Sequence, residues 1–185
     1  RAPRVADLDP ARREVIFTGP PRGLEGVKDP WLLEHGGVYH LFLSVATPTP
    51  ATAEGSHATL DIFNTGECRS ATALAISRDL EQWEWRGVVL APPAQGWERY
   101  CRRLNSVVPL PGGPAGGPRF LAFYDGSASH LENYEEKCAL AVSDDLIHWE
   151  TRSPAGPAFT SPHASTSLRY LDAQRAGGAW HLFYE

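Results

Sequence analysis

The sequence predicts an all-β protein, and more narrowly a run of β-propeller blades. Residues 72–84 read TALAISRDLEQWE and residues 138–150 read CALAVSDDLIHWE, so one long pattern occurs twice. A second element, rich in aromatic and branched residues, follows a glycine pair at each of three places, 38–44, 119–125 and 179–185. Strands separated by glycine turns and repeated in a fixed order are typical of propeller blades.

The repeated elements assemble into units of four antiparallel strands. The turn before the fourth strand of the first unit contains Asp79 and Trp83. We expect the strands of this unit at 31–34, 38–44, 71–77 and 85–90. A short apolar element before each glycine hairpin adds strand segments at 15–17, 88–90 and 158–159.

We expect a single propeller domain over residues 1–185, with blades at about 29–90, 105–159 and 167–185. The third blade is partial, because its pattern stops after the second strand, so the domain is apparently incomplete. Propellers protect strand edges by closing a ring, and we expect remaining blades or a partner chain to close this one. A β-sandwich also has evenly spaced strands, but it does not explain repeats with this internal order.

Composition limits the class of partner. Acidic residues outnumber basic ones by 22 to 17 and there is no basic block, so we expect no nucleic-acid partner. No apolar stretch approaches the roughly 18 residues of a membrane helix, so we expect no membrane partner. The three cysteines form no close pair, which argues against a disulfide framework or a zinc site. The compartment, cytoplasmic or secreted, stays unknown.

Residues 28–44, KDPWLLEHGGVYHLFLS, resemble the first blade of glycoside hydrolase family 43 and its five-bladed relatives. Those enzymes open a blade with Asp-Pro, an apolar strand, a glycine turn and an aromatic strand, and they share the S-x-D-L-x-x-W turn. The resemblance implies a five-bladed propeller that cleaves a glycosidic bond of an oligosaccharide or glycoside. It also implies a base Asp on the first blade, a second Asp that tunes the pKa, and an acid Glu on a later blade.

Position by position, the resemblance places the catalytic base at Asp29. The matching position of the second blade is Asn105, where the family has Asp, and residues 165–170 contain no Glu. The Glu-Cys pair of sucrose-cleaving relatives occurs here only at residues 67–68, outside its expected place. The remaining carboxylates of a hydrolase must therefore come from elsewhere in this sequence.

An acidic loop after the second aromatic strand offers such carboxylates. Asp125 ends the strand, and Glu135 and Glu136 follow within the same segment. We expect Asp125 to act as the second acid and Glu135 or Glu136 as the proton donor, since loops on a rigid scaffold commonly hold functional groups. The alternative is structural: Asp125 begins an Asp-Gly turn, and the glutamates begin a solvated strand.

Other residues are candidates for substrate binding. Arginines occur near the blade starts, and we consider two roles for them. They bind a carboxylate, sulfate or phosphate, which would indicate an anionic sugar or phosphorolysis, or they are surface residues without a ligand. The tryptophans have two possible roles, stacking on a sugar or packing between blades. The His in the long 45–69 insertion is expected either to reach the site or to face solvent. The candidates are Trp31, His57, Trp97, Arg103, Asn105 and Arg169.

The leading hypothesis is therefore a glycoside hydrolase-like enzyme with paired carboxylates. The alternatives are a non-catalytic carbohydrate-binding propeller, a phosphorylase-type relative that uses the channel arginines, and a structural or protein-binding propeller. We expect no cofactor, and structural calcium, which needs oxygen ligands, is the one metal considered.

Overall fold

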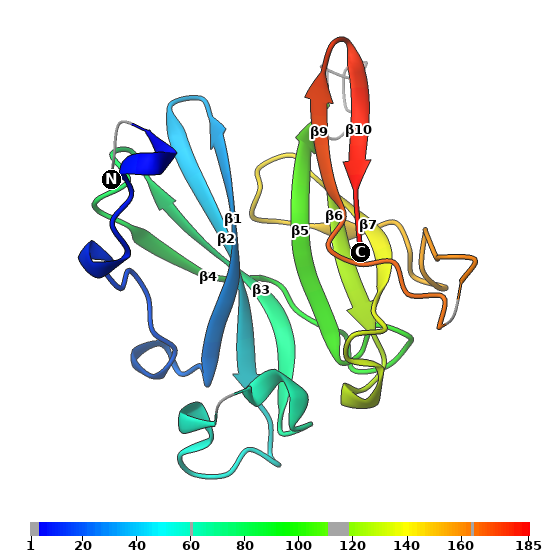
Figure 1. The fold of residues 1–185 in the computed structure, drawn as a ribbon. Coiled ribbons are helices and arrows are strands. Elements are labelled where there is room, and N and C mark those ends of the chain that lie inside the picture. Colours follow the sequence, from blue (N-terminus) through cyan, green and yellow to red (C-terminus); the bar gives the residue numbers. More distant parts are fainter. Residues whose placement is uncertain (1–3, 60, 111–118, 164) are drawn as a thin grey trace.

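The computed structural model describes residues 4–59, 61–110, 119–163 and 165–185. In this part the chain forms strands and single turns of 3₁₀ helix, and none of these turns is long and apolar enough to cross a membrane. The helical turns are η1 Val5–Asp7, η2 Pro10–Arg12, η3 Pro20–Arg22, η4 Ser56–Ala58, η5 Ile62–Asn64 and η6 His130–Glu132. Figure 1 shows two twisted groups of strands side by side, with a further hairpin next to the second group.

The first group is a four-stranded antiparallel blade. Its strands follow one another in space as in sequence, with β1 paired to β2, β2 to β3 and β3 to β4. They are β1 Gly26–His35, β2 Val38–Pro48, β3 Cys68–Ser77 and β4 Glu84–Leu90. All four predicted strands are confirmed, and β2 runs further into the predicted loop because it stays paired to β3 as far as Pro48 and Cys68.

The second group repeats this arrangement, and a two-stranded antiparallel hairpin lies where the sequence predicts the partial third blade. The strands are β5 Cys101–Pro109, β6 Phe120–Ser127, β7 Lys137–Ser143, β8 Glu150–Thr151, β9 Asp172–Ala176 and β10 Ala179–Phe183. A single parallel bridge, Ser70 to Cys101, joins the two blades. The glycine pair at 116–117 lies outside the described residues. An all-β propeller architecture is thus present in the described part of the chain.

Two predicted strand segments differ from the structure. The fourth strand of the second blade is the short β8, and Phe159 makes only an isolated bridge to Cys138. Pro154 and Pro157 follow β8, and proline lacks the N–H that a continuing strand ladder needs. Residues 15–17 belong to no strand in the described part of the chain; Phe17 instead packs against two tryptophans of the first blade.

Apolar side chains fill the space between the blades. One face of the first blade, with Phe42 and Leu74, packs against Phe120 and Tyr124 of the second blade. Its other face is covered by Leu24 and by aromatic residues of the N-terminal segment and β4. The hairpin β9–β10 packs on the far face of the second blade through Ala173. Burial of such side chains contributes about 1.5–3 kcal/mol each and fixes how the inner strands approach one another.

The repeated S-x-D-L-x-x-W pattern forms a hydrogen-bonded turn. In the second blade the Ser143 hydroxyl accepts bonds from the backbone of Asp145 and Leu146, and the Asp145 carboxylate accepts bonds from the backbone of Ile147 and His148. The first blade repeats these bonds at Ser77 and Asp79. The turn aims its Trp at the neighbouring face, where Trp149 meets Phe42 edge-on.

Replacing Asp145 with Ala should lower the free energy of unfolding by about 1 kcal/mol at neutral pH, because the turn loses its acceptor. Burial acts to raise the pKa of Asp145, but hydrogen bonds from His148, Ile147 and Ser143 outweigh it and hold the pKa well below its usual range. A depressed pKa contributes stability above the unfolded value, so the difference between the two proteins should shrink as the pH falls below about 4.

Urea denaturation of both proteins between neutral and acid pH measures this difference. Asp144→Ala is the matched control, since that neighbouring carboxylate accepts one backbone bond, from Arg119. A loss for Asp145→Ala that is the same at every pH would contradict the ionised acceptor.

Candidate active site

Three equivalent blade positions lie near one another at the inner strands. Strand β1 is irregular between Lys28 and Trp31, and β5 between Leu104 and Ser106, so Asp29 and Asn105 leave the regular ladder. In the third blade Tyr170 precedes the glycine pair by the same number of residues as Asp29 does in the first. These bulges direct side chains out of the strands toward a shared region.

Two of these positions have a left-handed backbone. Asp29 has a φ of 48° and Tyr170 a φ of 53°. A non-glycine residue in this region costs on the order of 1–3 kcal/mol, and such residues cluster at functional sites. The surrounding contacts must therefore hold both residues in place.

The guanidinium of Arg103, on β5, is the point where the carboxylates meet. Its Nη2 donates to Asp125 Oδ2 at 2.8 Å and to Glu136 Oε1 at 3.3 Å, and its Nη1 lies 3.7 Å from Asp29 Oδ2. The predicted catalytic residues Asp29, Asp125 and Glu136 therefore converge on one buried cation. We call these four residues the Arg103 cluster.

Asp125 is the innermost member of the cluster. It is fully buried and also accepts hydrogen bonds from Asn105 Nδ2 at 2.6 Å and from the Tyr170 backbone at 3.2 Å. Burial raises the pKa of Asp125 to about 6, against the opposing effect of Arg103. Burial acts to lower the pKa of Arg103, but the negative groups around it, Glu136 among them, raise it overall. The contacts with Arg103 and Asn105 thus favour the charged form of Asp125, while burial opposes it.

Glu136 links the cluster to a second arginine. Its side chain is 2% exposed, and its Oε2 lies 3.5 Å from Arg169 Nη1. Arg169 also pairs with Glu185 at 2.9 Å. Both arginines that the sequence suggested as anion ligands are thus engaged by carboxylates within the described part of the chain.

Asp29 differs from the other two carboxylates in its access to solvent. Its side chain is 35% exposed, whereas that of Asp125 is 0% exposed. Asp29 Oδ2 is itself buried between Arg103 and Lys28, each 3.7 Å away, and accepts no hydrogen bond from the described residues. One oxygen of this carboxylate is thus buried beside two cations, although about a third of the side chain is exposed.

The other predicted residues lie in different surroundings. Glu135 is exposed, next to the buried Glu136. His57 faces Glu25 at 3.4 Å. Trp97 packs against Gly126 and donates to the Ser153 backbone at 2.9 Å, a packing contact. Trp31 packs beside Phe42 and donates to Asp172 Oδ1 at 3.4 Å, which ties the first blade to the third.

Tyr170 is the member of the site that our reading of the sequence missed. Its ring lies under the Arg103 guanidinium at 4.4 Å, and its backbone N–H binds Asp125. Burial raises the pKa of its hydroxyl. The signal was present in the repeat, since Tyr170 occupies the position of Asp29 relative to the glycine pair.

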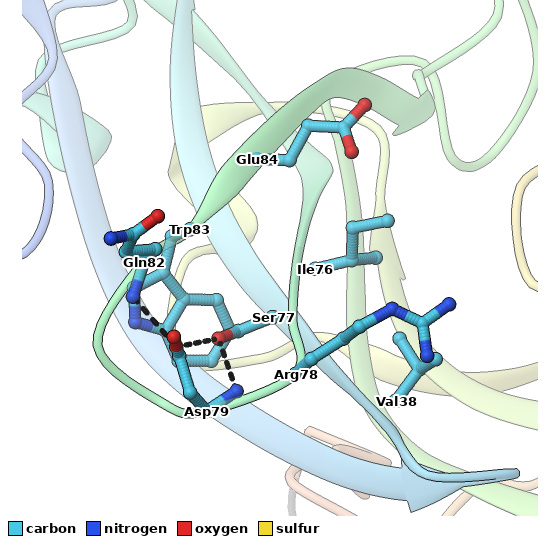
Figure 2. Close-up of a pocket in the computed structure, with 8 residues that line it drawn as sticks. All are labelled: Val38, Ile76, Ser77, Arg78, Asp79, Gln82, Trp83 and Glu84. Carbon is cyan, nitrogen blue, oxygen red and sulfur yellow. Dashed lines mark hydrogen bonds between the residues drawn. The ribbon is translucent and has the colours of Figure 1, made fainter.

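A hollow of about 660 Å³ lies elsewhere, at the turn of the first blade. Figure 2 shows Trp83, Gln82, Arg78 and Glu84 around it, with Asp79 hydrogen-bonded to Ser77 rather than free to act on a ligand. This hollow contains none of the Arg103 cluster. Among the described residues, no three His, Cys, Asp or Glu side chains are arranged to hold a metal ion.

Replacing Arg103 with Met should lower the free energy of unfolding by about 3–5 kcal/mol, because Asp125 and Glu136 would stay buried without their cation. Arg103→Lys should lose less, since it keeps the charge but not the planar fork. Arg86→Met, which breaks the exposed pair with Glu84, is the control and should cost at most about 1 kcal/mol. Chemical denaturation measures all three, and similar losses for Arg103→Met and the control would refute the role of the cluster.

No protein-family model and no curated protein sequence matches this chain. Solved structures do match. Zg3597, a family 117 glycoside hydrolase produced by the marine bacterium Zobellia galactanivorans, aligns over 85% of this chain and 47% of its own, with a TM-score of 0.61 and 15% identity. A glycosyl hydrolase from Bacteroides ovatus aligns over 91% of this chain and 47% of its own, with a TM-score of 0.53 and 13% identity.

A third match is a β-1,2-mannobiose phosphorylase from Listeria innocua in complex with β-1,2-mannobiose. It aligns over 86% of this chain and 36% of its own, with a TM-score of 0.52 and 18% identity. The chain spans less than half the length of these solved structures. At such identities the likeness concerns the fold, and this chain has the β-propeller fold of these sugar-cleaving enzymes.

Proposed function

We propose that this chain is the part of a glycoside hydrolase-like enzyme that holds Asp29 as the carboxylate acting on water at the scissile bond. The observation that supports this most is the arrangement of three carboxylates around Arg103, with Asp29 alone among them open to a ligand. The fold shared with glycoside hydrolases agrees with this function.

Glycosidic cleavage requires one group to protonate the leaving oxygen and another to activate water or attack the sugar. Asp29 suits the second task, because its backbone is held by the bulge and one of its oxygens faces Arg103. Asp125 is too deeply buried to touch a sugar and acts by holding Arg103 and Asn105 in place. Arg103 in turn positions Asp29.

The proton donor is the second part of the proposal. Glu135 is the candidate that a ligand can reach, and Glu136 is its buried neighbour in the cluster, with a side chain that is 2% exposed. Glu136 sits between Arg103 and Arg169, contacts that also suit a residue that only positions the two arginines. A leaving-group experiment separates these two roles.

The same geometry favours hydrolysis over phosphorolysis. A phosphate needs cations that are free to bind it, but Arg103 already contacts three carboxylates and Arg169 contacts Glu136 and Glu185. Two alternatives remain: a non-catalytic sugar-binding propeller predicts binding without turnover, and a structural or protein-binding propeller predicts neither.

Asp29→Asn should reduce kcat by about 10²–10⁴-fold on any glycoside that the protein cleaves, because the amide cannot accept a proton from water. Turnover of a panel of 4-nitrophenyl glycosides and of β-1,2-mannobiose measures it, with isothermal titration calorimetry for binding. Glu54→Gln, an exposed carboxylate outside the cluster, is the control and should leave kcat unchanged. Full activity of Asp29→Asn would refute the proposal, and binding without turnover by the unmodified protein would support the binding propeller.

If Glu136 is the proton donor, Glu136→Gln should lose activity on glycosides with poor leaving groups and keep much of it on 2,4-dinitrophenyl glycosides, which leave without protonation. A positioning residue would instead lose activity equally on both substrates. Glu135→Gln is the matched comparison. If the activated substrate restores activity in Glu135→Gln but not in Glu136→Gln, the proton donor is Glu135.

A further inference from the structure

A column of alternating arginines and tyrosines leads from the Arg103 cluster to the surface. The Arg103 guanidinium lies over the Tyr170 ring at 4.4 Å, and the Arg169 guanidinium lies 5.1 Å from both the Tyr170 and the Tyr134 rings. Its inner members are buried or partly buried, whereas Tyr134 at its outer end is 61% exposed. The column connects an exposed aromatic ring directly to the candidate active site.

Tyr134 is held firmly despite its exposure. Its backbone has a φ of 69°, a conformation that a tyrosine adopts only under constraint. Its hydroxyl accepts a bond at 3.1 Å from Asn64, which belongs to the long loop of the first blade. Asn64 is itself hydrogen-bonded to Asp61 and to Asn133, so the loops of two blades meet at this ring.

Because the Tyr134 ring is exposed, fixing it in place adds little apolar burial to the hydrophobic core. Its hydroxyl and one face are occupied by Asn64 and Arg169, and the large exposed fraction leaves apolar ring surface for a ligand. Aromatic side chains bring large contact area, and a ring that is already immobilised loses little conformational entropy when a ligand stacks on it. Sugars present apolar C–H faces of matching size.

We propose that Tyr134 is a stacking platform for a sugar unit of the substrate. This inference rests on the proposed function and extends it to the substrate class. Arg169 and Tyr170 separate Tyr134 from Arg103, so the stacked unit is not the one next to Asp29. The site therefore accepts an oligosaccharide that occupies at least one subsite beyond the scissile bond, rather than a single sugar with a small leaving group.

The test measures binding in the Asp29→Asn background, so that turnover plays no part. Xylo-, arabino- and β-1,2-manno-oligosaccharides of two to four units, with the matching monosaccharides, are titrated by calorimetry. Tyr134→Ala should weaken binding of the longer ligands about tenfold and leave monosaccharide binding unchanged. Tyr134→Phe keeps the ring but loses the bond from Asn64, so it should bind the longer ligands more tightly than Tyr134→Ala does. Leu131→Ala, another exposed residue of this loop, is the control and should also bind like the parent.

The outcomes distinguish the platform from the proposed function. If oligosaccharides bind with the same affinity to the parent and to Tyr134→Ala, the platform is wrong while the sugar site stands. If no saccharide binds to the parent, both are wrong. Tyr134→Leu, which keeps apolar bulk without a ring, serves if the Ala variant fails to fold, and parent-like binding by this variant contradicts stacking.

Discussion

A buried guanidinium is the constraint on which this site depends. Transferring the charged Arg103 guanidinium from water into the protein interior costs several kcal/mol of free energy. This cost is offset because carboxylates contact the guanidinium with good geometry. Those carboxylates come from β1, from β6 and from the segment before β7, so one ion cluster joins both blades. The third blade joins through the Tyr170 backbone, which binds Asp125. The same ion cluster therefore fixes both the positions of the inner strands and the geometry of the candidate site.

Burial assigns different tasks to chemically similar groups. Asp125 and Asp29 contact the same arginine, yet only Asp29 has a side chain that a ligand can reach. The buried carboxylate holds the cation, the cation holds the exposed carboxylate, and the bulge in β1 sets its direction. This order of support explains how the cluster keeps its geometry although Asp29 has a backbone conformation that is itself unfavourable. The column through Arg169 to Tyr134 extends the same support outward.

Much of the blade architecture was predictable from the sequence, because it is local. The S-x-D-L-x-x-W turn is closed by bonds between residues at most three apart, so its repetition identified the second blade. The shortness of β8 and the lack of a strand at residues 15–17 were not predictable, since both depend on whether a neighbouring strand is available for pairing. Asp29, Asp125 and Glu136 were candidates from the sequence alone, but their meeting at Arg103 was not visible there. Contacts between residues 22, 33 and 74 positions apart leave no local pattern. Asn105 stands where the family resemblance leads us to expect an aspartate. The structure explains the amide, because its Nδ2 donates a hydrogen bond to the Asp125 carboxylate.

The proposed function requires that a sugar binds next to Asp29, at the exposed side of the Arg103 cluster. A crystal structure of the Asp29→Asn protein with an oligosaccharide found by the binding screen tests it most directly. We expect a sugar ring, or the water that attacks it, within about 2.6–3.2 Å of the side chain of residue 29, with the contacts among Arg103, Asp125 and Glu136 preserved. A sugar bound instead in the hollow beside Trp83, with the surroundings of Asp29 empty of ligand, would contradict it.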